Sequence, residues 1–295
     1  MMNPVFNKIR ALVRLMRVYQ WTKNALVLMP LVFAQQLTDI DAILRSALAM
    51  AAFCCAASAT YILNDILDIQ KDRKHPEKKN RPLPRGDVSR PEAAILASLL
   101  LWVSVWLGLR LNTAFLIALM VYIGLTVSYS LVLKNVFIVD VIAVSMGFVI
   151  RAIAGAVAIE VVFSNWLIVC TLFLALFLAL GKRRGEIVLL EDQARTHREV
   201  LHHYSTTFID QMLLIVAGGA LITFTIYTCS TEVVARIGTD KLYMTLPFVV
   251  YGLARYLWLV EKNGTGDPSQ VLLKDWPTAL AVILWAVTCV AIIYG

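Results

Sequence analysis

Residues 42–72 read AILRSALAMAAFCCAASATYILNDILDIQKD, a long apolar run followed directly by a charged one. Within 42–63 the one charged side chain is Arg45. A helix rises about 1.5 Å per residue, so a run of this length can cross the hydrocarbon core of a bilayer, which is about 30 Å thick. The stretch therefore predicts a membrane-spanning helix that ends in a cluster of ions.

The composition of the whole chain agrees with this prediction. Of its 295 residues, 59% are hydrophobic and 16% are charged, with a mean hydropathy of +0.73, which is typical of a multi-span membrane protein and excludes a soluble domain. The five cysteines lie in apolar runs without a CxxC pair, so we expect buried small hydrophobic side chains. The net charge of +7 favours anionic lipids and anionic metabolites as partners, and no nucleic-acid partner is expected.

Nine stretches are apolar and long enough to be membrane-spanning helices. They are 24–38, 42–63, 93–111, 113–133, 137–160, 164–181, 209–229, 241–260 and 276–294. The first is the weakest, because Pro30 interrupts it and two glutamines close it early. A signal peptide is the competing reading of 1–36, but Ala34-Gln35-Gln36 is a poor cleavage site.

The distribution of basic residues orients these helices. With the N-terminus inside, the inner segments hold 21 Lys and Arg and the outer segments hold 4, which places the segments 64–92 and 182–208 in the cytoplasm. We therefore expect an all-α integral membrane protein with its N-terminus inside, a bundle of nine transmembrane helices around a cavity open to the cytoplasm. The chain is expected to be a single domain, 1–295, whose two charged loops, 64–92 and 182–208, form a cap over the site.

Four oxygen-bearing side chains follow the second predicted helix. Asn64, Asp68 and Asp72 recur at intervals of four residues, and Asp65 lies one step around the same helix. Because like charges at this spacing repel, the segment requires a cation among them. Mg²⁺ binds oxygen ligands and completes its shell with phosphate and water. The pattern predicts a magnesium–diphosphate site with Asn64, Asp65, Asp68 and Asp72 as the metal ligands.

Basic residues follow these carboxylates in a Pro-containing loop. Lys74, Lys78, Arg81 and Arg85 lie within 74–85. Arginine contacts phosphate through two parallel hydrogen bonds, and lysine acts as a point charge. Carboxylates that hold a metal, followed by cations that hold phosphate, indicate a site for a phosphorylated substrate. Scattered basic loops alone are explained by topology and lipid headgroups.

The motif Asn-Asp-x-x-Asp-x-x-x-Asp at 64–72 resembles the first aspartate-rich motif of the UbiA superfamily of intramembrane prenyltransferases. The resemblance covers essentially the whole chain. Within the superfamily, the chain is most similar to the branch that uses phosphoribosyl diphosphate in place of a prenyl diphosphate. This narrower likeness is carried by the blocks 20–24 (QWTKN), 72–78 (DRKHPEK), 81–82 (RP), 147–152 (GFVIRA) and 179–186 (ALGKRRGE).

The resemblance implies an enzyme of the bacterial cytoplasmic membrane whose active site faces the cytoplasm. It implies Mg²⁺-dependent transfer of 5-phosphoribosyl from phosphoribosyl diphosphate to a polyprenyl phosphate, with release of pyrophosphate, as a precursor for arabinose-type envelope glycans. The expected catalytic residues are Asp65, Asp68, Asp72 and Lys134. The expected substrate-binding residues are Lys23, Asn64, Lys74, Lys78, Arg81, Arg85, Tyr129, Asp140, Arg151, Lys182, Arg183 and Glu186.

The chain departs from the superfamily pattern at two motifs. The second aspartate motif, usually Asp-x-x-x-Asp after the sixth helix, is replaced by 181–192 (GKRRGEIVLLED), in which Glu186 is the first acid. The Tyr-x-x-x-Lys element is one residue longer here, from Tyr129 to Lys134. These departures leave the number of metal ions open. They also add cations, which suits a donor and an acceptor that together carry three anionic groups.

The sequence leaves several alternatives open. A prenyltransferase that acts on an aromatic ring or a porphyrin is the second function, and a secondary transporter is the third. Most acids lie in loops rather than at the bilayer midplane, which disfavours a transporter. Asp140 and Arg151 lie within predicted spans, where each is either a site residue or a partner for a neighbouring charge. The sequence is compatible with a homo-oligomer.

Overall fold

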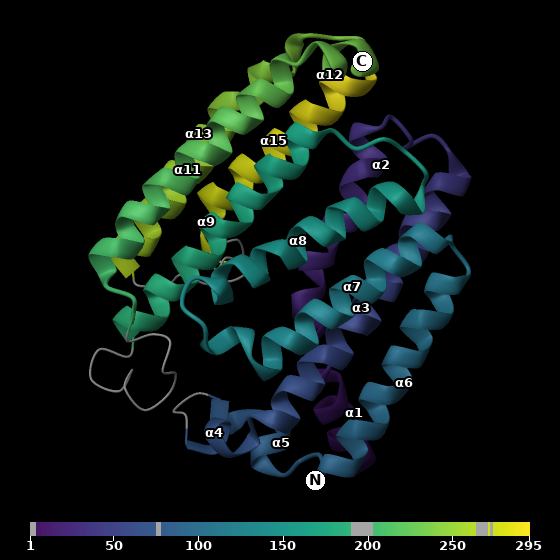
Figure 1. Cartoon of the computed structure of the whole chain (residues 1–295), viewed down its shortest axis with the longest axis vertical. Helices are drawn as coiled ribbons and strands as arrows, with labels where there is room; N and C mark the ends of the chain where they lie inside the picture. The colour runs from purple at the N-terminus through teal and green to yellow at the C-terminus, as the bar shows by residue number, and fades with distance from the viewer. Residues whose placement is uncertain (1–3, 75–77, 190–202, 264–270, 272–273) are drawn as a thin grey trace.

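The computed structural model describes residues 4–74, 78–189, 203–263, 271 and 274–295. Its described part is helical throughout and contains no strand. Eight helices are long and apolar enough to cross a membrane, which makes the chain a multi-pass membrane protein. The two termini lie at opposite ends of the molecule (Figure 1).

The helices that carry these spans begin and end close to the predicted boundaries, except at the end of the predicted span 164–181 and at the start of the predicted span 241–260. They are α3 (Ile40–Leu67), α6 (Arg90–Leu109), α7 (Thr113–Leu131), α8 (Val139–Ala158), α9 (Asn165–Leu189), α11 (Thr206–Cys229), α13 (Leu246–Asn263) and α15 (Trp276–Tyr294). Side-chain caps set several of their starts: Ser89 and Glu92 form a capping box at α6, and Asn112 caps α7.

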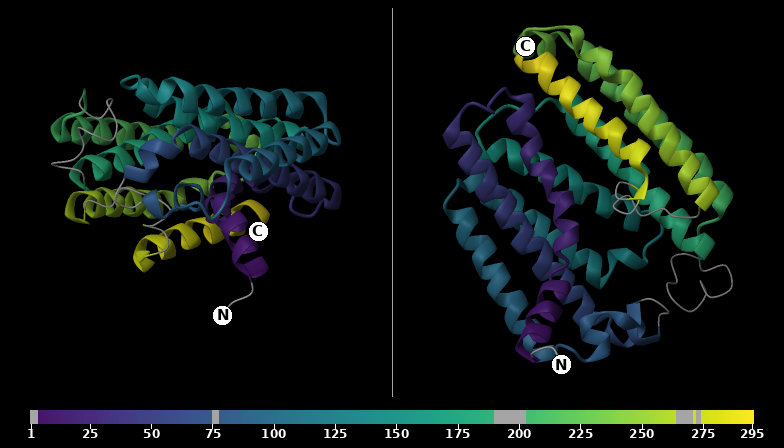
Figure 2. Two further views of the ribbon diagram at one scale, coloured as in Figure 1. Left: turned by 90° about the horizontal axis from the view of Figure 1, so that it is seen from below. Right: turned by 180° about the vertical axis from the view of Figure 1, so that it is seen from behind.

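Short elements connect the spans or lie at their ends. They are α1 (Pro4–Leu15), η1 (Val18–Leu28), α2 (Met29–Phe33), α4 (Ile69–Lys74), η2 (Lys78–Asn80), α5 (Pro82–Arg85), η3 (Leu133–Asn135), α12 (Thr231–Ile237) and η5 (Lys241–Thr245). Helices α1, α4 and α5 lie at the end that holds the N-terminus, and α12 lies at the other end, near the C-terminus (Figure 1). Seen from below, α1 projects from one side of the bundle (Figure 2), and it contacts α5 and α3.

The segment 24–38 differs most from the prediction, because it is not one regular helix. The 3-10 helix η1 and the five-residue helix α2 cover Val18–Phe33 instead. The backbone N–H of Met29 donates to the carbonyl of Leu26, three residues back. Pro30 follows and has no N–H to offer, so the α-helical hydrogen bonds cannot run through this point.

The helix α9 continues about two turns beyond the predicted end at 181. Lys182, Arg183 and Glu186 therefore lie on a helix rather than in the predicted loop 182–208. Of the two predicted cap segments, 75–77 and 190–202 lie outside the described residues. Their part in a cap stays a prediction.

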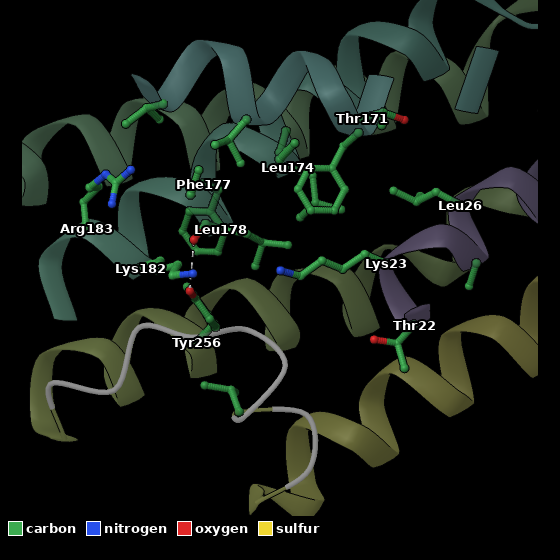
Figure 3. A pocket seen from close by; sticks show the side chains of 18 of the residues that line it. Thr22, Lys23, Leu26, Thr171, Leu174, Phe177, Leu178, Lys182, Arg183 and Tyr256 are labelled. Carbon is green, nitrogen blue, oxygen red and sulfur yellow. Dashed lines mark hydrogen bonds between the residues drawn. The ribbon is translucent and has the colours of Figure 1, made fainter. Parts of the chain in front are cut away.

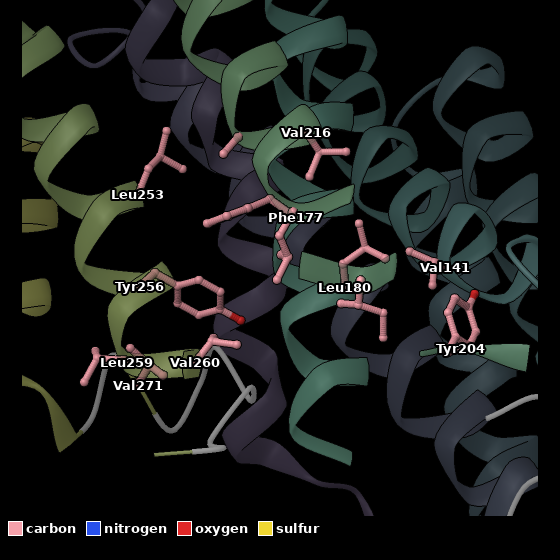
Figure 4. Close-up of a cluster of buried hydrophobic side chains, with 13 residues drawn as sticks. Val141, Phe177, Leu180, Tyr204, Val216, Leu253, Tyr256, Leu259, Val260 and Val271 are labelled. Carbon is pink, nitrogen blue, oxygen red and sulfur yellow. The ribbon is translucent and has the colours of Figure 1, made fainter. Parts of the chain in front are cut away.

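Consecutive spans pack side by side, and the core forms where they meet. Helix α3 packs on α6, α7 on α8, α8 on α9, and α9 on α11. Figure 4 shows one buried cluster, in which Phe177 of α9 and Tyr256 of α13 lie beside Leu180 and Leu253. At the α9–α13 contact, Gly181 lies so close to Tyr256 that a Cβ atom at that position would be 2.5 Å from its hydroxyl oxygen. This close approach requires glycine.

Candidate active site

The four predicted metal ligands lie at the junction of α3 and α4. Together, Asn64, Asp65, Asp68 and Asp72 are called the carboxylate row. The N–H of Asp68 donates to the carbonyl of Asn64 at 2.9 Å, and the N–H of Asp72 donates to the carbonyl of Asp68 at 2.8 Å. Helical spacing is therefore kept across the junction. Asn64, Asp68 and Asp72 all line one cavity, whereas Asp65 is 1% exposed and does not line it.

Each of the three carboxylates is paired with a cation from another part of the chain. Lys134 Nζ lies 2.7 and 2.8 Å from the carboxylate oxygens of Asp68 and 3.3 Å from Asn64 Oδ1. Arg81 Nη1 bridges Asp72 Oδ2 at 2.6 Å and Asp65 Oδ1 at 3.1 Å. Arg17 donates to the same Asp65 oxygen. These three cations explain how like charges coexist at helical spacing.

The cavity has a volume of about 1100 Å³ and combines a charged end with an apolar wall. Eight basic side chains and three acidic side chains line it. The basic ones are Arg17, Lys23, Lys71, Lys78, Arg81, Lys134, Lys182 and Arg183. Figure 3 shows Lys23 extending from η1 toward the side of the cavity where Lys182 and Arg183 lie. The excess of positive charge makes this end an attractive site for anions.

A second polar cluster holds Arg183 at the cavity wall. Its Nε donates to Asp140 Oδ2 at 2.7 Å and its Nη2 donates to Tyr129 Oη at 3.1 Å, while Nη1 donates to Glu186. Behind it, Tyr204 Oη donates to Asp140 Oδ1 at 2.7 Å. Burial, together with this hydrogen bond, raises the pKa of Tyr204 above its usual range. Tyr204 therefore remains a proton donor at physiological pH.

The structure places Arg151 behind the cavity wall. Its three donors reach Asn24 Oδ1 at 2.7 Å, Tyr122 Oη at 2.7 Å and the carbonyl of Gly147 at 2.9 Å. The guanidinium lies 5.3 Å from the ring centroid of Phe148, and Phe148 itself lines the cavity. Of the two roles that the sequence left open, its position favours structural pairing, because Arg151 does not line the cavity.

The cavity brings together eleven of the sixteen predicted site residues. Those that line it are Lys23, Asn64, Asp68, Asp72, Lys78, Arg81, Tyr129, Lys134, Lys182, Arg183 and Glu186. Asp65, Asp140 and Arg151 are buried behind the wall. Lys74 is exposed at the end of α4, and Arg85 is exposed and paired with Asp87 at 3.4 Å. Neither of these two exposed side chains lines the cavity.

Sequence reasoning missed three residues that shape this site. By sequence Arg17 is one of the 21 inner basic residues that set the topology, yet it lines the cavity and pairs with Asp65. Its position, three residues before the block 20–24, was the available signal. Lys71 lines the same cavity, and its place among the carboxylates of 64–72 could have indicated this. For Tyr204 no sequence pattern pointed to the contact with Asp140.

The oxygen atoms of the carboxylate row fit a hard divalent cation. Asn64 Oδ1 and both carboxylate oxygens of Asp68 already converge on one cationic atom, Lys134 Nζ. Oxygen-only ligands of this kind suit Mg²⁺, which needs few of them when phosphate and water complete its shell. Among the described residues, no group of three His, Cys, Asp or Glu side chains is close enough to bind a metal ion. Phosphate and water would therefore have to supply the other ligands.

Membrane-length helices surround a cavity that has a charged end and an apolar wall, an arrangement that suits an enzyme embedded in the bilayer. The chain belongs to the UbiA prenyltransferase family, whose sequence model matches residues 25–276. Within this family it is a membrane transferase, and the predicted resemblance is confirmed.

Curated relatives and solved structures agree with this membership. The chain is 30% identical over 301 residues to the decaprenyl-phosphate phosphoribosyltransferase of Mycolicibacterium smegmatis, covering 99% of this chain and 95% of the relative. It is 30% identical over 296 residues to the protein of the same name from Corynebacterium glutamicum, covering 99% and 89%. A UbiA homolog from Archaeoglobus fulgidus, bound to GPP and Mg²⁺, has the same fold, with a TM-score of 0.72 at 16% identity over 97% of this chain and 100% of that one.

Proposed function

We propose that this protein transfers 5-phosphoribosyl from phosphoribosyl diphosphate to a polyprenyl phosphate, with release of pyrophosphate and with Mg²⁺ as cofactor. The observation that carries the proposal is a single cavity in which eight basic side chains and a row of carboxylates adjoin an apolar wall. The near-full-length similarity to two decaprenyl-phosphate phosphoribosyltransferases supports the choice of donor and acceptor.

The charged end suits a donor with phosphates at two positions. Phosphoribosyl diphosphate carries a diphosphate at C1 and a phosphate at C5, and the acceptor adds a third anionic group. Lys134, Arg81 and Lys78 lie near the carboxylate row, and Lys182 and Arg183 lie on α9. Basic residues on separate elements can contact separate phosphates. A prenyl diphosphate has one charged end and needs fewer of them.

The apolar wall suits the lipid tail of the acceptor. Leu174 and Phe177 of α9, Phe224 of α11, and Val282 and Trp285 of α15 line the cavity. A polyprenyl chain reaches this wall from the bilayer, whose interior is equally apolar, so the wall contributes van der Waals packing rather than removal of the chain from water. The phosphate of the acceptor then lies at the charged end, beside the donor.

In this proposal the chain supplies positioning and charge rather than a nucleophile. The second pKa of a phosphate monoester is about 6, so the acceptor oxygen is ionised and attacks C1 of the ribose without a protein base. The C1–O bond to the diphosphate breaks, and its electron pair leaves with pyrophosphate. Lys134 and Arg81 stabilise the negative charge that builds on the leaving oxygens.

Asn64, Asp68 and Asp72 would hold the magnesium ion, and when bound it would neutralise the departing pyrophosphate. Arg183, fixed by Asp140 and Tyr129, holds its guanidinium at the cavity wall to bind a phosphate. The donor and acceptor are thereby held in line, which is the main contribution expected of a site without a protein nucleophile.

We also propose that residues 1–295 form one transferase domain of the bacterial cytoplasmic membrane, spanning it nine times when η1 and α2 are included. The charged end, with the N-terminus, would face the cytoplasm. This orientation is supported by the bias of basic residues, 21 against 4. The water-soluble donor would then enter from the cytoplasm and the lipid acceptor from the bilayer.

The test is transfer of label in membranes that contain the protein. We expect radiolabel from phosphoribosyl diphosphate to enter the organic phase only with polyprenyl phosphate and Mg²⁺ present, and the Asp68→Asn variant to lose this transfer. A parallel incubation offers geranyl diphosphate and an aromatic acceptor, because the fold neighbour from Archaeoglobus fulgidus was solved with GPP. Label moving only in that parallel incubation would reject the proposal in favour of a prenyltransferase.

A further inference from the structure

The carboxylate row is electrically balanced by the protein itself. Asp65 pairs with Arg17, Asp72 pairs with Arg81, and Asp68 pairs with Lys134. Three acids thus face three bases within ion-pair distance. The acids are shielded from water, with side-chain exposures of 2% for Asp65, 6% for Asp72 and 20% for Asp68. No net negative charge is left at the row to attract a free metal ion.

The surroundings of the carboxylate row also disfavour binding of a free metal ion. The cavity beside it has eight basic and three acidic lining residues, so a divalent cation that enters alone meets a positive field. The oxygens that would bind it, those of Asn64 and Asp68, are already in contact with Lys134 Nζ. A free ion would have to displace Lys134, a buried and tethered cation whose ion pair among the described residues is with Asp68.

A diphosphate changes this balance. Its oxygens are alternative partners for Lys134 and Arg81, so both side chains can leave the carboxylates without becoming unpaired. Lysine suits this exchange, because its ammonium group is a point charge with three donors on a flexible stem. When Lys134 and Arg81 bind the phosphate oxygens, the oxygens of Asn64 and Asp68 are released and can bind the metal ion.

We propose that Lys134 is a tethered counter-ion that closes the carboxylate row to free divalent metal, so that the metal is bound only together with a diphosphate. This inference rests on the proposed use of a diphosphate donor. It concerns only the diphosphate part, which phosphoribosyl and prenyl donors share, and so it can hold or fail separately from the identity of the transferred group.

The test is equilibrium dialysis of the purified full-length protein with Mn²⁺ as the metal and inorganic pyrophosphate as the probe. For the wild type we expect Mn²⁺ to bind at least about tenfold more tightly with pyrophosphate than without it. In the Lys134→Met variant, without pyrophosphate, Mn²⁺ should bind at least about tenfold more tightly than in the wild type, because Asp68 has lost its cation.

Two further variants make the result decisive. Asn64→Asp adds a carboxylate beside Lys134 without removing any cation, and it should also gain affinity for Mn²⁺ alone, which keeps the test valid if Lys134→Met fails to fold. Lys241→Met removes an exposed lysine outside the cavity and should match the wild type. Equal Mn²⁺ affinity of the wild type with and without pyrophosphate would overturn the proposal, as would unchanged metal affinity in folded Lys134→Met and Asn64→Asp.

The same dialysis separates this inference from the proposed function. Loss of label transfer from phosphoribosyl diphosphate, with pyrophosphate-dependent Mn²⁺ binding intact, would reject the proposed donor and leave the role of Lys134 standing. The opposite result, transfer of label together with tight binding of Mn²⁺ alone, would support the function and reject the counter-ion role.

Discussion

Arg183 and Arg184 are adjacent in sequence, yet they face different surroundings. Successive residues of a helix point about 100° apart, so Arg183 faces the cavity while Arg184 turns toward α11 and α13. Arg184 Nε donates to Asp210 at 2.5 Å, and its Nη1 donates to the carbonyl of Val260 at 2.8 Å. The Asp210 side chain is 47% exposed, whereas that of Asp140, the partner of Arg183, is fully buried. The two pairs therefore form a natural comparison of a fully buried carboxylate and a half-exposed one.

Asp140→Asn is expected to weaken binding of the anionic donor. The substitution leaves Arg183 with one carboxylate fewer in a buried site, and breaking such a pair costs about 3–5 kcal/mol. The guanidinium should then lose its fixed position at the cavity wall. We expect the KM for phosphoribosyl diphosphate to rise at least about tenfold, since about 1.4 kcal/mol corresponds to each factor of ten, measured as initial rates of label transfer.

Asp210→Asn is the matched control for this prediction. It removes the carboxylate partner of Arg184 in the same way, but that carboxylate is half exposed to water and neither member of the pair lines the cavity. Its KM should stay within about twofold of the wild type. Equal effects of the two variants would mean that Arg183 is not positioned through Asp140.

At the residue scale, the spacing of acids could be predicted but their partners could not. Helical periodicity correctly placed Asn64, Asp68 and Asp72 on one cavity wall. The same periodicity could not show that Asp65, one step around the helix, meets Arg17 from a segment 48 residues away. Likewise, the cost of a charge in hydrocarbon indicated that Arg151 needs partners, but Asn24 and Tyr122 are identified only by the packing.

At the scale of elements, η1 is held against α8 by one very close contact. A Cβ atom added at Gly155 would lie 2.1 Å from the carbonyl oxygen of Val27, a distance that no side chain allows. Asn24 of η1 is also bonded to Arg151 of α8. The spacing of Gly147 and Gly155 puts both on one face of α8, and small residues let helices approach closely. The partner η1 was not predicted, because apolarity alone predicted a regular helix over 24–38.

Gly155→Ala is expected to displace η1 and with it Lys23, which lines the cavity from that element. Overpacking of this kind costs about 1–3 kcal/mol. The variant should therefore unfold at a lower temperature in detergent, and it should show a higher KM for phosphoribosyl diphosphate because Lys23 is moved.

Gly124→Ala on α7 is the control, because a Cβ atom there meets nothing within 4 Å. Alanine is the better helix former by about 0.5–1 kcal/mol, so its unfolding temperature should be unchanged or higher. A Gly155→Ala variant as stable and active as this control would show that η1 accommodates the added methyl group.

At the scale of the whole molecule, the sequence predicted the order and extent of the spans well. Apolar runs predicted the starts of all eight membrane-length spans to within a few residues, because a bilayer requires such runs whatever the tertiary contacts. In the span predicted as 241–260, the first residues form η5 and α13 follows. The cavity and its charge balance come from contacts between distant segments, which periodicity does not encode.

The proposed orientation is also tested on the whole molecule, by labelling introduced cysteines in intact cells. Asp87 lies between α5 and α6 and Asp240 lies between α12 and η5, and both are exposed. In a variant without the five native cysteines, Asp87→Cys should react with a membrane-impermeant maleimide only after the cells are permeabilised. Asp240→Cys should react in intact cells. With 21 basic residues in the inner segments and 4 in the outer ones, the end of the molecule that carries Asp240 is expected to lie outside the cytoplasm. Label on Asp87→Cys in intact cells would place the charged end of the cavity outside the cytoplasm, where phosphoribosyl diphosphate made in the cytoplasm could not reach it.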